Sequence, residues 1–310
     1  MRKGNITVVT AVLLFIFGIL TISPITAQEE PFAWDGESRF TVLVLGMDRR
    51  PGARDTLRVR TDVNILISID PATQSMGMLH LPRDFHFTPV GTADFVRVNT
   101  LMLEGENLSE GYGPYFAMET LQYNLGMYID RYVAFDFEAF ITIIDAMGGI
   151  EIDVEYPISD PTYPDMNGGF DPFYIDAGMQ FLDGETALQF ARTRHGDNDF
   201  QRGLRQLQVI DGIYQRLQAD GVLTSLLPQA PLLFTQIQNN IYTDIPLEEV
   251  VQLAQVAVNI PQENIVTNTI GAEGYYISYA TQDGRTVYIP DRTSIADLMV
   301  EIFGENYTVR

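Results

Sequence analysis

The segment Phe190–Gln206, with the sequence FARTRHGDNDFQRGLRQ, holds four arginines within fourteen positions: Arg192, Arg194, Arg202 and Arg205. They belong to a chain with 19 basic residues, 41 acidic residues and a formal net charge of -22. The guanidinium group is a planar fork of donors that matches a phosphate or a carboxylate in bidentate fashion. Because arginine gathers here in so acidic a chain, we predict a local anion-binding site.

The spacing within the segment suggests how the donors converge. Arg192 and Arg194 alternate, so on an extended segment they point to the same side. Arg202, Arg205 and Gln206 have i, i+3, i+4 spacing, so on a helix they share one face. Two sets of donors from neighbouring elements are therefore expected to meet at one ligand. The alternative is a solvated loop and helix whose arginines pair with nearby acids such as Asp197 and Asp199.

The composition excludes several classes of protein. The chain has 310 residues, of which 46% are hydrophobic, which is typical of a globular protein with one large or two smaller domains. It has no cysteine, which excludes disulfides and thiolate metal sites. Its acidity argues against nucleic-acid binding, which needs a basic surface. Neither a phosphate-binding GxxxxGK[ST] loop nor a zinc-type HExxH spacing is present.

Residues 1–30 are interpreted as a membrane anchor or a signal segment. Arg2 and Lys3 precede a mostly apolar run, Ile6–Ile22, which is close to the minimum length for a membrane span. A cleaved signal is the alternative, although Ile25 is a poor residue at position -3 of a cleavage site, and a buried helix is a third reading. The positive-inside rule places the rest of the chain outside the membrane.

Three short apolar runs predict strands, namely Phe40–Leu45, Val63–Ile69 and Met76–Leu81. In a meander, the end of the first strand, the start of the second and the end of the third lie at the same end of the sheet. Polar side chains occupy all three places: Asp48, Asp62, Arg83 and Asp84.

Asp48 and Asp62 are the candidate metal ligands. Mg²⁺ prefers one or two carboxylates together with phosphate oxygens of a substrate. Alternatively, Asp48 caps a turn and Asp62 pairs with Arg60.

The remaining patterns predict the fold class. Helices are expected at 114–125, 137–147, 184–190, 203–220, 247–258 and 294–303, a strand at 150–156 and a hairpin within 275–289. Strands and helices mixed without strict alternation predict an α/β or α+β sandwich.

A series of motifs resembles the LytR-CpsA-Psr family. The motifs are GMDRR at 46–50, RTD at 60–62, LPRD at 81–84, VNT at 98–100, DAMGGI at 145–150, LDGETALQFARTR at 182–194 and DFQRGLRQ at 199–206. They follow the order of the family and cover about residues 38–217. One departure is His80, which stands where the family usually has a small or polar residue.

The resemblance implies an α/β fold, a mixed-sheet α-β-α sandwich, with a catalytic core at 38–217. Residues 218–310 are then an extension of the same domain or a small appended one. It also implies an extracytoplasmic, membrane-anchored phosphotransferase that moves a glycopolymer, such as a teichoic acid, from a polyprenyl-pyrophosphate carrier to peptidoglycan.

By motif position, the resemblance assigns Mg²⁺ (or Mn²⁺) to Asp48 and Asp62. It assigns the pyrophosphate to a larger set, Arg60, Arg83, Arg192, Arg194, Arg202 and Gln206, and the lipid tail to an apolar pocket between sheet and helices. Arg83, Asp84, Arg192 and Arg194 are the candidate catalytic residues, with Asp84 acting as a base or orienting Arg83.

Two other functions are compatible with the same residues. A non-catalytic protein that holds a polyprenyl phosphate would keep the arginines but would not need both aspartates. A polyprenyl-pyrophosphate pyrophosphatase would give the phosphoryl group to water. The sequence does not identify the glycopolymer or the acceptor hydroxyl.

Overall fold

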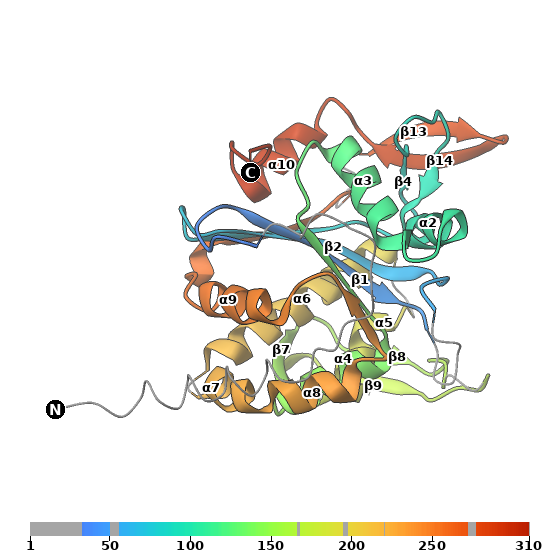
Figure 1. The fold of residues 1–310 in the computed structure, drawn as a ribbon. Helices are drawn as coiled ribbons and strands as arrows, with labels where there is room; N and C mark the ends of the chain where they lie inside the picture. Colours follow the sequence, from blue (N-terminus) through green and yellow to red (C-terminus); the bar gives the residue numbers. More distant parts are fainter. Residues whose placement is uncertain are drawn as a thin grey trace. The chain divides into compact units, whose positions relative to one another are not determined.

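The computed structural model describes residues 33–49, 56–165, 168–194, 198–219, 221–271 and 277–309. Residues Trp34–Arg310 form one compact unit, which is built around a six-stranded sheet of order β11-β6-β1-β2-β3-β12 (Figure 1). The strands of this sheet are β1 (Phe40–Met47), β2 (Thr61–Asp70), β3 (Ser75–His80), β6 (Arg131–Phe135), β11 (Ile241–Thr243) and β12 (Ile265–Thr269).

The sheet is mixed. β1, β2 and β3 pair as an antiparallel meander, as the three apolar runs predict. β6 runs parallel to β1 and β12 runs parallel to β3, whereas β11 is antiparallel to β6. Both edge strands of the sheet, β11 and β12, therefore come from the last hundred residues.

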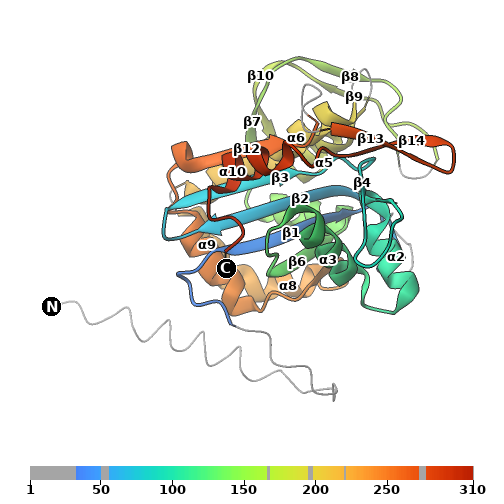
Figure 2. The same ribbon diagram turned by 90° about the horizontal axis from the view of Figure 1, so that it is seen from above.

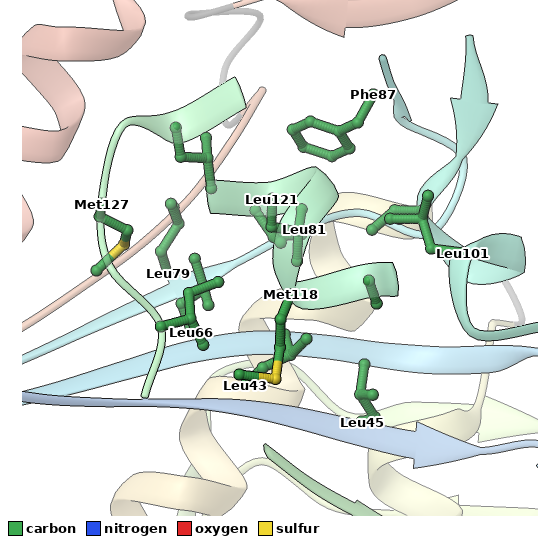
Figure 3. Close-up of a cluster of buried hydrophobic side chains, with 14 of the residues drawn as sticks. Leu43, Leu45, Leu66, Leu79, Leu81, Phe87, Leu101, Met118, Leu121 and Met127 are labelled. Carbon is green, nitrogen blue, oxygen red and sulfur yellow. The ribbon is translucent and has the colours of Figure 1, made fainter. Parts of the chain in front are cut away.

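Side chains alternate between the two faces of the sheet, so each face has its own core. On one face Leu43, Leu45 and Leu66 are almost fully buried beneath Met118 and Leu121 (Figure 3). The helices that supply this layer are α2 (Leu101–Leu108), α3 (Gly113–Leu125) and α10 (Ile295–Phe303). Figure 2 shows α3 and α10 lying across the strands.

Helices from other parts of the chain cover the opposite face. They are α4 (Phe137–Ala146), α5 (Gly184–Arg192), α6 (Asp199–Gln218) and α9 (Leu247–Ala257), drawn below the sheet in Figure 1. The strand pair β7 (Ile150–Val154) and β10 (Gly178–Leu182) packs with α4, α5 and α6 in a separate cluster of buried residues. This arrangement confirms the predicted α/β sandwich with a mixed sheet.

The remaining elements are short. They are β4 (His86–Phe87), β5 (Val96–Arg97), β8 (Ile158–Asp160), β9 (Phe173–Ile175), α7 (Val222–Leu226), α8 (Ala230–Ile237), β13 (Ile277–Gln282) and β14 (Arg285–Pro290), with 3₁₀ turns at Val98–Thr100, Leu227–Gln229 and Gln262–Asn264. β13 and β14 form the predicted hairpin, and its turn residues Asp283 and Gly284 both have positive φ.

Two expectations about the arginine segment need correction. Arg192 is not on an extended segment, because α5 continues to that residue. The following helix begins at Asp199 rather than Gly203, because Asn198 caps it: the Asn198 side chain accepts from the Gln201 N–H, and the Gln201 side chain accepts from the Asn198 N–H.

The apolar run Ile6–Ile22 and the interpretation attached to it lie outside the described residues. Within the part of the chain that the structure describes, no helix combines the length and the apolar character needed to span a membrane.

Candidate functional site

A cavity of about 560 Å³ lies between the central sheet and the helices α4, α5 and α6. Its walls are mostly apolar. They include Val44, Val63, Ile65 and Ile67 from the sheet and Phe137, Phe140, Ile143, Ile144, Leu188, Val209, Ile210 and Ile213 from the helices. The alternation of each strand explains the sheet side: in β1, Val44 and Gly46 face the cavity while Leu43 and Leu45 face the other core.

Polar side chains gather at one part of this apolar wall. Arg192 and Arg194 reach it from the end of α5 and the residues that follow, and Arg202 and Gln206 reach it from the first half of α6. Asp62 reaches it from β2. The structure therefore brings together four of the predicted anion-binding residues and one predicted metal ligand around one cavity.

A β-bulge directs Asp62 into the cavity. Gly46 pairs with Val63, but Met47 pairs with Thr61, so Asp62 is an extra residue in β2. In a regular strand, Asp62 and Val63 would point to opposite faces. Because of the bulge, both line the cavity.

Arg192 is held by aromatic rings. Its Nη1 donates to the Tyr163 hydroxyl at 2.9 Å, and its guanidinium carbon lies 4.1 Å from the centroid of the Phe137 ring. A guanidinium over an aromatic face is stabilised by the quadrupole of the ring. Nothing in the sequence pattern distinguishes Phe137 or Tyr163 from ordinary core residues, so this clamp could not be predicted.

Arg202 is almost fully buried, with a side chain that is 3% exposed. Its Nη2 lies 2.5 Å from an oxygen of Asp199, one turn earlier in α6, so the expected pairing with Asp199 is present for this arginine. Burial lowers the pKa of Arg202, whereas the charge of Asp199 opposes this shift. Its Nε is buried without a hydrogen bond in the described part of the chain, so the group retains an unused donor.

Asp199 also links Arg202 to Arg83. Arg83 Nη1 donates to both carboxylate oxygens of Asp62 at 3.1 Å, and its Nε lies 3.6 Å from Asp199. Burial raises the pKa of Asp199, and the charges of Arg202 and Arg83 oppose that shift. The result is a chain of alternating charges from Asp62 through Arg83 and Asp199 to Arg202.

Arg205 has a structural role that differs from the roles of Arg202 and Gln206. It is buried, and it donates from Nε to the Phe190 carbonyl at 2.9 Å and from Nη2 to the Thr193 carbonyl at 2.5 Å. It therefore fastens the end of α5 to α6, which fixes the positions of Arg192 and Arg194.

Four sequence candidates lie outside the cavity wall, and one of them is Arg83, which contacts the cavity residue Asp62. Arg60 is exposed, and its carbonyl accepts the Asp48 N–H at 2.9 Å. Asp84 is half exposed and pairs with Arg97 at 3.3 Å, with Arg83 Nε 3.9 Å away. Asp48 is half-buried, and Asp62, not Asp48, lines the cavity.

The donor chemistry of Asp48 and Asp62 fits a hard divalent cation. Among the described residues, no group of three or more His, Asp or Glu side chains could hold a metal ion by itself. Mg²⁺ sites commonly use only one or two carboxylates and take their other oxygens from substrate phosphates, so Asp48 and Asp62 stay the predicted metal ligands.

Sequence reasoning missed His80 as a part of the site. It is fully buried in β3, and its Nδ1 is 2.8 Å from the Thr269 hydroxyl. α6 can pass directly over its ring only because residue 203 is glycine, since a Cβ there would lie 2.2 Å from His80 Cε1. Burial and the charge of Arg202 lower the pKa of His80 to about 3, so the imidazole is neutral.

An apolar cavity with buried and exposed arginines in its lining has the chemistry that suits an amphiphilic anion. The sequence model of the LytR_cpsA_psr family matches residues 23–302, so the chain belongs to this family. A curated relative is the polyisoprenyl-teichoic acid–peptidoglycan teichoic acid transferase TagV of Bacillus subtilis, 27% identical over 261 residues. The match covers 83% of this chain but 62% of TagV, so the chain spans less than two thirds of this relative.

Solved structures share the fold. The crystal structure of Bacillus subtilis TagV aligns with a TM-score of 0.65 and 25% identity, over 86% of this chain and 97% of that one. The structure of TagT bound to LIIa-WTA aligns with a TM-score of 0.65 and 19% identity, over 92% and 96% of the two chains.

The neutral His80 makes a testable contribution to stability. Its pKa is about 3 in the folded chain and about 6.5 unfolded, so the unfolded chain binds an extra proton between these values. The stabilisation is complete above pH 6.5 and is lost as the pH falls, by about 1.4 kcal/mol per pH unit. His80→Asn should remove this slope between pH 6.5 and 5.5 in denaturant unfolding of the full-length chain.

The half-buried His86 provides the matched control, because its pKa is also lowered but it lies outside the arginine site. In His86→Asn, the free energy of unfolding should still fall between pH 6.5 and 5.5 by the amount that His80 contributes. An unchanged slope in His80→Asn would show that the imidazole is not held neutral.

Proposed function

We propose that the protein is an extracytoplasmic phosphotransferase that moves a glycopolymer from a polyprenyl-pyrophosphate carrier to peptidoglycan. The observation that carries this proposal is the apolar cavity of about 560 Å³ with Arg192, Arg194 and Arg202 at one side. A polyprenyl pyrophosphate has the matching halves, an apolar chain and a highly charged head group. Burial of the chain supplies affinity, while the arginines fix the head group.

The names of the relatives support the proposed polymer and the proposed acceptor. TagV is named for transfer of polyisoprenyl-linked teichoic acid to peptidoglycan, and TagT has been solved with LIIa-WTA. By family membership we extend this substrate class, a polyisoprenyl-linked glycopolymer, to the present chain.

We assign the pyrophosphate to the predicted set of donors, which comprises Arg60, Arg83, Arg192, Arg194, Arg202 and Gln206. Support is strongest for the residues that line the cavity. Arg192 and Arg202 are held in place by Tyr163 and Asp199, so they are oriented before the ligand arrives. Preorganised positive charge of this kind is the main source of catalysis in phosphoryl transfer.

The reaction requires one bond to form and one to break. A hydroxyl oxygen of the acceptor attacks the phosphorus that carries the glycopolymer, and the bond from that phosphorus to the bridging oxygen breaks. The products are the phosphodiester-linked polymer and polyprenyl phosphate, and the hydroxyl proton leaves to a base or to water. Asp84 pairs with both Arg83 and Arg97, which favours a role in orienting Arg83 over a role as the base.

Asp48 and Asp62 are the residues that would hold Mg²⁺ (or Mn²⁺). When bound, such an ion neutralises charge on the phosphate oxygens. Asp62 also accepts two hydrogen bonds from Arg83, which hold its carboxylate at the edge of the cavity.

The arginine assignment predicts a loss of ligand affinity. Hydrogen bonds to charged groups contribute about 1.5–3 kcal/mol each, so Arg194→Ala should weaken binding of farnesyl pyrophosphate by roughly ten- to a hundred-fold. Arg194→Lys should restore part of this affinity, because a point charge does not reproduce the bidentate fork. Arg285→Ala is the control, because Arg285 is also exposed but lies on β14, outside the cavity. Affinities within about two-fold of wild type for Arg194→Ala would favour a solvated surface arginine.

The metal assignment predicts a selective loss of transfer. Asp62→Ala and Asp48→Ala should each reduce divalent-metal-dependent polymer transfer to peptidoglycan by about 10²-fold or more while leaving the fold intact, because both lie at strand ends. Release of polymer phosphate into water, without attachment to peptidoglycan, would indicate a pyrophosphatase. Binding of the lipid without any turnover would indicate a carrier protein. Full transfer in the double variant, or in excess EDTA, would refute the assignment.

We also propose that residues 31–310 lie outside the cell membrane. The basic start and the apolar run Ile6–Ile22 support this orientation. External protease should digest the domain in intact spheroplasts, while a cytoplasmic marker stays protected. Protection of the domain until lysis would contradict the proposal.

A further inference from the structure

A second concavity lies on the other side of α6. This groove, of about 950 Å³, is lined by residues 154–159 at the end of β7, by α6 and by β12 together with the turn before it. α6 contacts both β7 and β12 (Figure 2). The helix is therefore a partition: Arg202, Gln206 and Val209 face the apolar cavity, whereas Gln201, Leu204 and Gln208 face the groove.

The groove has fewer cationic residues than the cavity, where three arginines accompany three aspartates. Glu155 and Asp211 line the groove, and its one cationic residue among the described residues is Arg205. Arg205 donates to the Phe190 and Thr193 carbonyls and is buried, so its charge is directed into the protein. An anionic polymer would meet two carboxylates here without compensation, so the groove selects against phosphate-bearing ligands.

The polar lining offers both donors and acceptors. Gln201 and Gln208 project from α6, and Gln262 lies opposite them before β12. Asp211 is fixed between two amides, accepting from Gln215 Nε2 at 2.7 Å and from Gln262 Nε2 at 3.2 Å. Amides and carboxylates in an open groove suit the hydroxyl and acetamido groups of sugars, which both donate and accept.

Tyr156 provides an apolar surface in the same groove. Its side chain is 71% exposed, although a large aromatic ring normally gains from burial. The neighbouring Glu155 carboxylate raises the pKa of Tyr156. An exposed aromatic ring in a groove lined by amides matches a pyranose, which has an apolar C–H face and a polar rim.

We propose that this groove binds a neutral, N-acetylated oligosaccharide. Together with the proposed function, on which this further step rests, the ligand would be the glycan strand of the acceptor. The donor phosphates and the acceptor would then occupy opposite faces of α6, sorted by charge. Gln201 of the groove and Arg202 of the cavity are neighbours in the first turn of α6, so a strand in the groove would reach the phosphate site at that end.

The test uses the purified full-length chain and the β-1,4-linked tetramer of N-acetylglucosamine. Wild type should bind the tetramer saturably in calorimetry. Tyr156→Ala should weaken binding by about tenfold, the equivalent of one lost aromatic contact of about 1.4 kcal/mol. Gln208→Ala should also weaken it. Tyr123→Ala is the matched control, because Tyr123 is 58% exposed but lies on α3, on the opposite face of the sheet.

Other outcomes are equally decisive. Absent tetramer binding, or equal binding by wild type and both groove variants, would overturn the inference. So would saturable binding of an unglycosylated stem peptide in place of the tetramer, which would point to strand addition at the β12 edge. Farnesyl pyrophosphate is titrated into the same samples. If farnesyl pyrophosphate fails to bind while binding of the tetramer still depends on Tyr156, the groove inference is supported and the proposed transfer reaction is contradicted.

Discussion

The site depends on the close contact between α6 and β3. Gly203 lets the helix pass over the buried His80 ring, and no larger residue fits at that position. Because α6 lies so close to β3, Arg202 and Gln206 reach the cavity between the sheet and the helices. These two residues lie on either side of Gly203 in the sequence. A charged guanidinium in such a place is tolerated because Asp199 lies 2.5 Å away and the neighbouring imidazole stays uncharged. The absence of a side chain at Gly203 therefore determines both the packing of α6 on β3 and the positions of Arg202 and Gln206.

The sequence allowed the prediction of those features that depend on local pattern. The meander of β1, β2 and β3 follows from three apolar runs, and it brings Asp62 and Arg83 together as its geometry requires. The shared face of Arg202 and Gln206 follows from helical spacing, but Arg205, which was predicted to lie on the same face, lines the groove on the other side of α6. The extended segment at Arg192 was wrong, because the alternation of two arginines was also compatible with a helix end followed by a turn.

Other features depend on partners distant in the sequence. β11 has three residues and becomes a strand by pairing with β6, about a hundred residues earlier in the chain. The bulge at Asp62 becomes visible only when β1 is aligned with β2. The rings that hold Arg192 come from α4 and from the segment after β8. None of these partners leaves a periodic signal, so single-sequence reasoning has no basis on which to choose them.

The two edge strands of the central sheet come from the end of the chain. During synthesis, β1, β2, β3 and β6 leave the ribosome first, and their open edges at β6 and β3 stay unpaired until β11 and β12 follow. Unpaired edges are templates for association with other chains, and slow long-range pairing prolongs their exposure. Truncation from the C-terminus would therefore remove edge strands of the central sheet and not only a surface appendage. It leaves a nascent sheet with both flanks open to aggregation.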